Sequence, residues 1–466
     1  MANDARAILR RSGNASRVLG PCNSTAAAAT GHAAWIRTRG RDACLRHIHC
    51  EAHCEWKELH ANIHDQTGSK VISTRRLIIP LSLSAALLLG ALFHWASLRD
   101  LVSGTTPPGV QLVLPSAYVL LSPLSRTLDA IGLLSTGEHI VLGVTAIVLG
   151  LIVFGFRARA ALPLLALAIL YVCAAALPRP MAKIVVTDPT VVVVDFHSHT
   201  NFSGDARMGF SPEENRAWHR EAGFNVAYIS DHRSFGGAEA GLHGNPARAG
   251  DNTVLLSAYE GRYLGTFEIF LGLTRADSAI LLTRQRWLRE GSLQSGRIPV
   301  SVVAMPGPLG DVQVDGRGNP PHFVAIELSD GSPKGFSQID RDWLKIIRRA
   351  DTLRLSLVSG SNNHGWARVS PAWTLLRIPG WRGMSPDSLG AAIETTLRSP
   401  GAVEIIERRR PALGSPVAMS LTAPVLVGQM LASLTLRERV VWLLWTWGAT
   451  LIVAMLARPE APRTVP

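Results

Sequence analysis

The stretch "TVVVVDFHSHTNFSGD", residues 190–205, places a run of valines directly before two histidines and an aspartate. Consecutive valines favour a β-strand that is buried on both faces, because β-branched side chains pack well on a pleated surface. His197 and His199 follow at positions i and i+2 of an extended segment, so both imidazoles point the same way and can reach one ion. The stretch therefore predicts a buried strand that ends at a metal site.

Apolar runs of strand length recur along the next 160 residues and alternate with polar helical segments. The runs are "NVAYIS" (225–230), "TVLLSA" (253–258), "EIFLGL" (268–273), "IPVSVVA" (298–304), "HFVAIEL" (322–328) and "LRLSLVS" (353–359). The segment "SPEENRAWHREAG" (211–223) predicts a helix with Ser211 as N-cap and Pro212 at its first position. This alternation predicts an α/β fold, a parallel sheet or distorted (β/α) barrel over residues 185–436, with ligands at the carboxyl ends of the strands.

Side chains that bind metals follow several of these predicted strands. They are His197, His199, Asp205, Asp231, His232, Glu260, Asn362 and His364. A single pair of histidines is weak evidence, since a histidine at a strand end is often merely exposed, but four such groups point to one shared site. Asp231 has two readings, a group that orients an imidazole or moves a proton, and an ordinary strand-end cap. His219 matches no ligand position, and we expect it to be exposed on its helix.

Three motifs resemble the polymerase and histidinol phosphatase (PHP) superfamily, and the resemblance covers about residues 190–370. "HSHTNFSGDARMGFSPEENRAWHREAGFNVAYISDH" (197–232) is similar to that family's opening, "AYEG" (258–261) to its third element and "GSNNHG" (360–365) to its closing motif. The resemblance implies a PHP-type distorted barrel with phosphoesterase activity.

Carried over residue by residue, the resemblance implies two divalent ions, of Mn²⁺, Zn²⁺, Mg²⁺ or Fe²⁺. One ion is assigned to His197, His199, Glu260 and Asn362, and the other to Asp205, His232 and His364. Glu260 would bridge or orient the pair.

The chain also departs from the family at three positions. Asn362 stands where the family has an aspartate, which lowers the charge of its site. Met305 stands in a histidine position, and the histidine expected near the fourth strand is missing, with Glu268 the nearest substitute. These departures favour two ions over three.

Two arginines flank the ligand motifs. Arg262 and Arg368 could bind a substrate phosphate, although each could equally be an ordinary solvated side chain.

Four apolar segments are long enough to cross a ~30 Å hydrocarbon core. We expect transmembrane helices at residues 77–98, 139–156, 161–177 and 440–456. Residues 99–138 are expected to form a loop or re-entrant segment, because the apolar part at 109–124 is broken by Pro115 and Pro123.

The basic residues beside these segments predict the orientation of the chain in a cell membrane. If the arginines at 75, 76, 157, 159 and 458 are cytoplasmic, the 185–436 domain lies outside the cytoplasm. If residues 109–124 crossed instead, the domain would be cytoplasmic.

Charge and cysteines are concentrated outside the main domain. Residues 185–436 hold 25 Lys and Arg against 24 Asp and Glu, whereas residues 1–76 hold 12 against 6. The near-neutral domain does not favour nucleic-acid binding. Residues 1–76 are expected to be a disordered basic arm or sequence upstream of the true start. The Cys and His residues of "CLRHIHCEAHCEWKELHANIH" (44–64) leave a small metal knuckle as an alternative.

The sequence thus predicts a membrane-anchored enzyme that hydrolyses a phosphomonoester or phosphodiester with a metal-activated water. The alternative is a non-catalytic sensor or assembly domain that uses the same fold to bind a metal or ligand.

Overall fold

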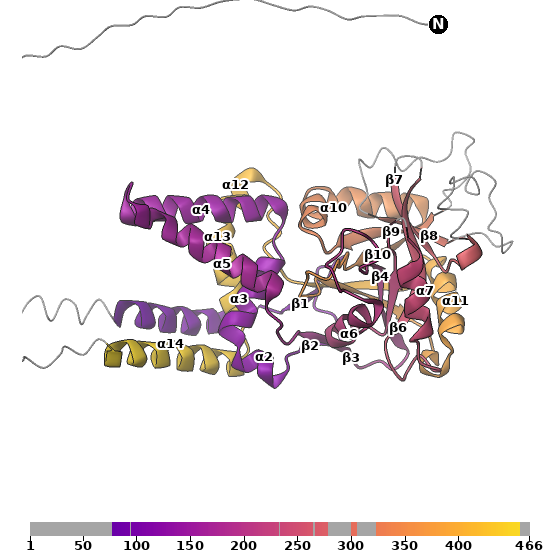
Figure 1. Cartoon of the computed structure of the whole chain (residues 1–466), viewed down its shortest axis with the longest axis horizontal. Helices are drawn as coiled ribbons and strands as arrows, with labels where there is room; N and C mark the ends of the chain where they lie inside the picture. The colour runs from indigo at the N-terminus through magenta and orange to yellow at the C-terminus, as the bar shows by residue number, and fades with distance from the viewer. Residues whose placement is uncertain are drawn as a thin grey trace, which may run out of the picture. The chain divides into compact units, whose positions relative to one another are not determined.

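The computed structural model describes residues 77–93, 95–232, 234–263, 266–277, 300–304 and 323–456 (Figure 1). The expected arm at 1–76, the position of Met305 and the arginines at 75, 76 and 458 lie outside the described residues.

A ten-stranded sheet forms the centre of the domain, in the order β1-β12-β11-β4-β5-β6-β7-β8-β9-β10. The strands are β1 (Leu98–Asp100), β4 (Val191–Ser198), β5 (Val226–Ile229), β6 (Val254–Tyr263), β7 (Thr266–Leu271), β8 (Val300–Ala304), β9 (Phe323–Asp330), β10 (Ser356–Gly360), β11 (Ala372–Arg377) and β12 (Val403–Arg408). All seven runs predicted as strands are strands, whereas β1, β11 and β12 were not predicted.

The sheet is mixed, which corrects the expectation of a parallel one. The pairs β4–β5, β5–β6, β8–β9 and β9–β10 are parallel, as expected for strands joined by helices. β7 runs antiparallel to both β6 and β8, and β11 runs antiparallel to β4 and β12. A short connection joins β6 to β7, and such a connection permits only an antiparallel pair.

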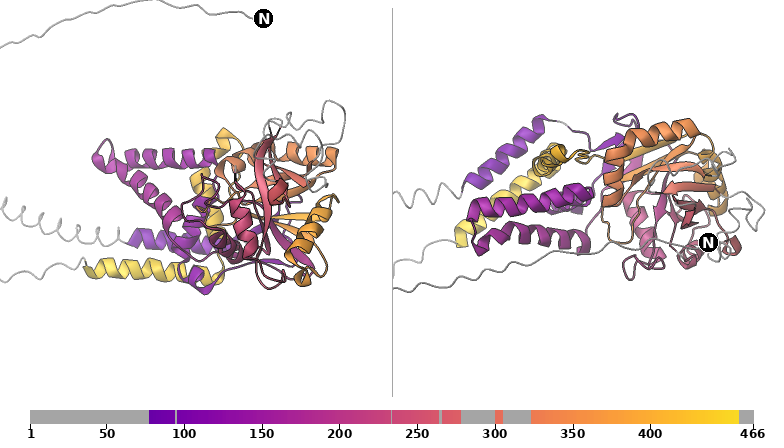
Figure 2. Two further views of the ribbon diagram at one scale, coloured as in Figure 1. Left: turned by 45° about the vertical axis from the view of Figure 1, so that its right-hand side comes forward. Right: turned by 90° about the horizontal axis from the view of Figure 1, so that it is seen from above.

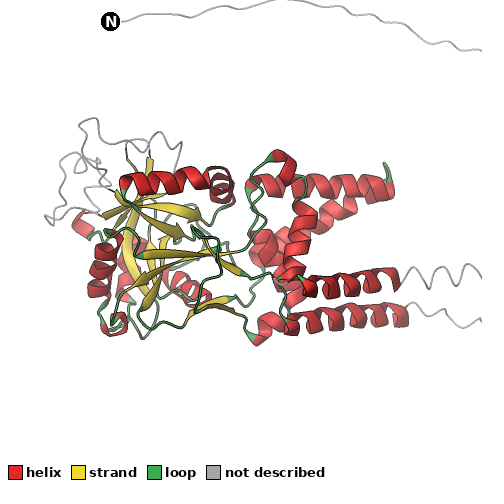
Figure 3. Ribbon diagram, turned by 180° about the vertical axis from the view of Figure 1, so that it is seen from behind, coloured by secondary structure: helices red, strands yellow, loops and turns green. Residues whose placement is uncertain are grey.

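The sheet curls so that its last strand returns to β4 (Figure 3). The backbone amide of Asn362 donates to the carbonyl of His197 at 2.7 Å, and that of His199 donates to the carbonyl of Asn363 at 3.1 Å. Ser198 and Asn363 form a parallel bridge. The curled sheet agrees with the distorted barrel that was predicted, and it brings the ends of β4 and β10 together.

Helices cover both faces of the sheet. α11 (Pro386–Leu397) packs on a core formed by alternate residues of β4 to β8, whereas α6 (Pro212–Ala222), α7 (Gly236–His243) and α10 (Pro333–Leu353) pack on the opposite face. The predicted helix start is confirmed, because Ser211 accepts a hydrogen bond from the amide of Glu214 at 3.2 Å.

Within the described part of the chain, three helices are long and apolar enough to cross a membrane. They are α4 (Thr136–Phe154), the segment Ala158–Ala176, made of η1 (Ala158–Ala161) and α5 (Leu162–Ala176), and α14 (Leu436–Leu456). They match three of the four predicted spans.

The expected span at 77–98 is shorter in the described structure. Its helix covers Leu77–Leu92, and β1 already begins at Leu98. This helix lies beside α14 (Figure 2), where Arg439 donates to the carbonyls of Leu87 and Gly90 at 2.6 and 3.0 Å. The chain is in the sheet from Leu98, where β1 pairs with β12.

Residues 99–138 contain regular elements, so the loop alternative does not hold, while the re-entrant alternative stays a prediction. They contain β2 (Val110–Val113), α2 (Ser116–Leu120) and α3 (Ser122–Gly132). β2 pairs with β3 (Lys183–Val186), which precedes β4 in the chain. Pro115 and Pro123 fall at the starts of the two short helices, so residues 109–124 form no continuous spanning helix.

Buried ion pairs join the apolar helices to the sheet. Asp129 of α3 accepts hydrogen bonds from Tyr118 at 2.7 Å, Arg408 at 3.0 Å and Arg179 at 3.2 Å. Arg126 of the same helix pairs with Glu438 of α14 at 2.6 Å. A second short helical pair, α12 (Pro416–Met419) and α13 (Thr422–Ala432), leads from the sheet into α14.

Candidate metal centre

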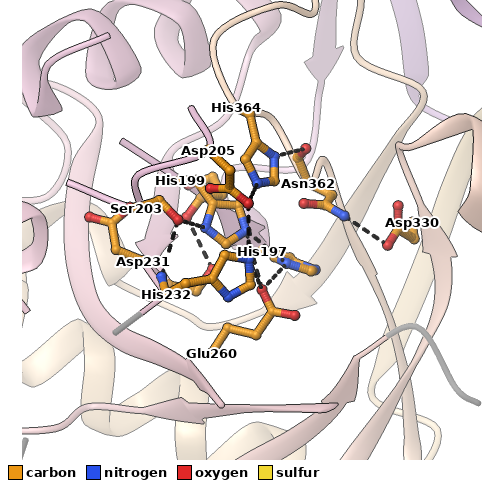
Figure 4. A network of polar contacts seen from close by, with 12 residues as sticks. His197, His199, Ser203, Asp205, Asp231, His232, Glu260, Asp330, Asn362 and His364 are labelled. Atoms are coloured by element: carbon orange, nitrogen blue, oxygen red, sulfur yellow. Dashed lines mark hydrogen bonds and ion pairs between the residues drawn. The ribbon is translucent and has the colours of Figure 1, made fainter. Parts of the chain in front are cut away.

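Side chains from four strand ends converge at the edge where β4 meets β10 (Figure 4). β4 supplies His197 and, just beyond it, His199, while β6 supplies Glu260. His232 follows β5 and His364 follows β10. Parallel neighbours end at the same edge of a sheet, which explains how residues 167 positions apart come within contact distance.

Glu260 lies at the middle of the cluster. Its Oε2 is 3.0 Å from Nε2 of His197, 3.3 Å from Nε2 of His199 and 3.4 Å from Nε2 of His232. The ligand atoms of His197, His199 and Glu260 all lie within 4.8 Å of one another. This group contains three of the four residues predicted for the first ion.

Asp205 marks the solvent side of the cluster. Its Oδ2 is 3.3 Å from Nε2 of His364 and 3.6 Å from Nε2 of His232, and its side chain is 55% exposed. His199, His232 and His364 form a second group within 4.8 Å, with the His199 ring stacked at 4.1 Å from that of His364. The residues predicted for the second ion are therefore together, and His199 lies between the two groups.

Each of three imidazoles is held through Nδ1 and directs Nε2 into the centre. Nδ1 of His364 donates to the carbonyl of Asn362 at 3.0 Å, which leaves Nε2 of a neutral ring with its lone pair exposed to the centre. Nδ1 of His199 contacts Oγ of Ser203 at 3.3 Å, and Nδ1 of His197 contacts both oxygens of Glu327 at 3.3 Å. Holding one ring nitrogen so that the other faces an ion is the usual support of a metal-bound histidine.

Burial and neighbouring charges give His199 and Glu260 the forms that bind cations, whereas the carboxylates of Glu260 and Glu327 raise the pKa of His197 against its burial, so a cation bound there would displace a proton from this ring. Burial and the nearby His197 and His364 lower the pKa of His199 to about 3, so this ring is neutral at physiological pH. Burial alone would raise the pKa of Glu260, but His197 and His199 outweigh it and lower that pKa, so the carboxylate is ionised. Neutral imidazole nitrogens and carboxylate oxygens are donors that suit Zn²⁺, Mn²⁺ and Fe²⁺, and the residues fit a divalent cation.

The side chain of Asn362 points away from the first group. Its amide nitrogen donates to Oδ2 of Asp330 at 3.0 Å, while its backbone links His197 to His364. Asn362 also has a positive φ of 44°, a conformation that asparagine tolerates better than most residues. In this arrangement its clearest role is to shape the loop after β10.

Two acidic residues at the end of β9 were missed by the sequence reasoning. Glu327 and Asp330 form a third group with His197 within 4.8 Å. The signal was visible, since "IELSD" (326–330) places two acids at the end of a predicted strand. Gly360 makes the approach possible, because a Cβ there would lie 2.0 Å from Oε1 of Glu327 and 2.3 Å from Cβ of His197.

Asp231 contacts a loop and none of the imidazoles. Its two oxygens accept hydrogen bonds from the amide and the hydroxyl of Thr200, both at 2.6 Å. Burial raises the pKa of Asp231 to about 6, although the hydrogen bonds from Thr200 act in the opposite direction and lower it. Of the two readings given for Asp231, this contact matches the cap that fixes the backbone after β4.

His219 is buried, so the expectation of an exposed side chain is wrong. Its Nε2 lies 2.7 Å from Oδ2 of Asp195, and the other oxygen of Asp195 accepts from the amides of His197 at 3.1 Å and Ser361 at 2.9 Å. The periodicity of α6 did not reveal this partner, because Asp195 lies within a run of valines.

The two candidate phosphate-binding arginines differ in what the structure describes. The side chain of Arg262 lies outside the described part of the chain, while Arg368 lines a cavity with Asp205, Asn362 and His364.

Glu268, the suggested substitute ligand, is buried and accepts a hydrogen bond from Ser301 at 3.0 Å. It belongs to none of the candidate metal-binding groups among the described residues.

Comparisons with known proteins give only distant similarities. No family model and no curated protein matches the chain. Among solved structures, PsfC from Pseudomonas syringae is 17% identical with a TM-score of 0.33, covering 50% of this chain and 97% of that one. A two-domain protein containing a predicted PHP-like metal-dependent phosphoesterase from Bacteroides vulgatus is 13% identical with a TM-score of 0.29, covering 46% and 64%. An amidohydrolase from Chromobacterium violaceum with bound sulfate and no metal is 14% identical with a TM-score of 0.27, covering 41% and 98%.

We predict that Glu327 strengthens metal binding through His197. In Glu327→Gln the acceptor for Nδ1 of His197 loses its charge, and metal affinity should fall by about 10–100-fold, as for other partners of metal-bound histidines. Titration of the metal-free protein against a competing chelator measures the change. Glu268→Gln is the matched control, a buried glutamate on β7, two strands away from β9, and should leave affinity unchanged. Equal losses in both variants would contradict the role of Glu327.

We also predict opposite effects of Asn362→Asp with and without metal. The new carboxylate would face Asp330, so repulsion should lower the Tm of the metal-free protein, while the added charge should tighten the bound ion. Thermal unfolding with and without EDTA, together with elemental analysis, measures both effects. Three firmly bound ions in the wild type, or no gain in affinity from Asn362→Asp, would show that these positions are assigned wrongly.

Proposed function

We propose that this chain is a membrane-anchored, metal-dependent phosphoesterase. The observation that carries the proposal is the convergence of four imidazoles and Glu260, with Nδ1 of three rings fixed by the chain and their Nε2 atoms turned to one centre. His197, His199 and Glu260 would hold one ion, and Asp205, His232 and His364 the other. When bound, such cations lower the pKa of water from about 15.7 toward about 7 and neutralise phosphoryl oxygens.

The chain's own residues supply the remaining requirements of a phosphoester site. Arg368 lines the cavity beside Asp205 and His364, has no ion-pair partner among the described residues, and its buried Nε has no hydrogen-bond partner. A guanidinium without an ion-pair partner can bind a phosphate oxygen through charge-assisted hydrogen bonds. His232 and His364 lower the pKa of Asp205, whose exposed carboxylate lies on the solvent side of the centre.

A binding domain without turnover is the second candidate. Asn362 directs its amide to Asp330 and adds no charge to the first group, which weakens the hold on one cation. Tight metal binding without hydrolysis of any phosphoester would favour this candidate.

The test of hydrolysis uses the full-length protein in detergent with Mn²⁺, Zn²⁺ or Mg²⁺ and a panel of phosphomonoesters and phosphodiesters. His199→Ala removes a ligand shared by both groups and should lower kcat/KM by more than about 100-fold, since losing only a supporting partner already costs 10–100-fold. His243→Ala, an exposed histidine on α7, is the matched control and should leave activity unchanged. Hydrolysis that survives both EDTA and His199→Ala would rule the proposal out.

We further propose that the domain faces the outside of the cytoplasm. Arg157 and Arg159 are exposed at the turn between α4 and α5, the end of this helical hairpin that is remote from β3 and the sheet. Positive residues are retained on the cytoplasmic side. A green fluorescent protein fused after residue 466 should then fluoresce, and an alkaline phosphatase fused there should be inactive. The reverse pattern would place the domain in the cytoplasm.

A further inference from the structure

One cavity connects the metal centre with the apolar helices. It has a volume of about 430 Å³ and is lined by residues of the metal-ligand loops and by residues of α3, α4 and α5. We propose that it takes a phosphoester with a hydrocarbon tail, so that the substrate is a membrane lipid rather than a soluble metabolite. This inference rests on the proposed phosphoester hydrolysis and adds the substrate class.

The polar end of the cavity suits a phosphate. Asp205, Asn362 and His364 line it on the side of the metal centre, and Arg368 follows in the same loop. Burial and the neighbouring Arg207 and Arg179 lower the pKa of Arg368, because three guanidinium groups share this region. Arg207 is paired with Glu214 and Arg179 with Asp129, whereas Arg368 has no such partner among the described residues. An incoming anion would relieve the repulsion among these cations.

The side of the cavity formed by α3 and α5, its apolar end, is lined mostly by hydrocarbon side chains and also by Arg179, which donates to the carbonyl of Ala174 at 2.8 Å. Leu128 and Ile131 of α3 and Ala174 and Ala175 of α5 form this wall. The two alanines leave space beside α5, which belongs to a segment apolar and long enough to cross a membrane. Leu128 and Ile131 are already buried in the chain, so a soluble phosphoester would leave only the half-buried Ala174 and Ala175 without an apolar partner, whereas the first carbons of a lipid tail would cover them.

Residues typical of a membrane interface also line the cavity. Tyr171 of α5 contacts Nδ1 of His139 of α4 at 2.6 Å, and both line the cavity. His139 is in the first turn of α4 and Tyr171 is near the end of α5, so this pair is on the side of the hairpin that meets the sheet. Trp366 also lines the cavity and is 54% exposed. Tyrosine and tryptophan are enriched at the level of lipid headgroups, where a phosphoester would be presented.

The experiment compares esters that share a headgroup and differ in the tail. The full-length protein in detergent micelles with Mn²⁺ is given dioleoyl phosphatidic acid or glycerol 3-phosphate, and dioleoyl phosphatidylglycerol or glycerophosphoglycerol. We expect kcat/KM to be at least about tenfold higher for the long-chain member of a pair, the range seen when apolar groups fill an enzyme pocket.

Two substitutions on α5 locate the effect. Ala175→Trp fills the apolar end and should lower hydrolysis of the long-chain ester by about tenfold or more, while changing that of the soluble ester less than about twofold. Ala166→Trp is the matched control, because residue 166 is exposed and nine positions away, on the opposite side of the helix. It should change neither activity. Arg368→Ala acts at the polar end and should lower hydrolysis of both esters.

Binding to the metal-free protein separates failure of this inference from failure of the proposed function. Native mass spectrometry of the EDTA-treated chain should show dioleoyl phosphatidic acid bound to wild type and Ala166→Trp, and much less bound to Ala175→Trp. Lipid binding of this kind without any phosphoester hydrolysis would overturn the phosphoesterase proposal and keep the lipid site. Hydrolysis with no preference for the long chain, or equal effects of Ala175→Trp on both esters, would overturn the lipid site and keep the phosphoesterase.

Discussion

The meeting of β4 and β10 around the carboxylate of Asp195 is the constraint on which the site depends. Asp195 is buried and binds the ring of His219 through one oxygen and the amides of His197 and Ser361 through the other. A buried carboxylate is costly unless its hydrogen-bonding capacity is satisfied, and these three donors satisfy it only when α6, β4 and β10 are in place. The same geometry fixes His197 and His199 against the loop that carries His364.

Seven of the ten strands of the sheet and most ligands could be predicted because they depend on local pattern. The run of valines before His197 and the ligand groups after Ile229, Ala258 and Gly360 carry their own signals, and the curled sheet unites them. Pairing direction could not be predicted in the same way, since β7 and β11 have strand composition whichever neighbour they join. Glu327 and Asp330 were missed because acids at a strand end look alike whether they face a histidine or solvent.

The junction between the apolar helices and the sheet is specified by charge rather than by apolar packing alone. Asp129 binds Tyr118, Arg179 and Arg408, and Arg126 binds Glu438, all largely buried. Buried ion pairs add little net stability because desolvation offsets their attraction, but breaking one leaves an uncompensated charge. Such a network therefore favours one arrangement of α3, α5 and α14 against β12. The cavity is shaped by this junction, because α3 and α5 form its apolar wall.

The proposal of two cations agrees with the formal charges of the carboxylates at the centre. Glu260, Asp205, Glu327 and Asp330 provide four carboxylates around the imidazoles, and Asn362 contributes none. Two dications would balance these four formal charges, whereas a third would leave excess positive charge in a largely buried site. Arg368 then provides the additional positive charge at the cavity, where it can attract a phosphate without binding the ions. In the proposed site, an asparagine where the family pattern has an aspartate would thus reduce the number of ions that can be neutralised, while Arg368 would still offer a substrate anion a cationic partner.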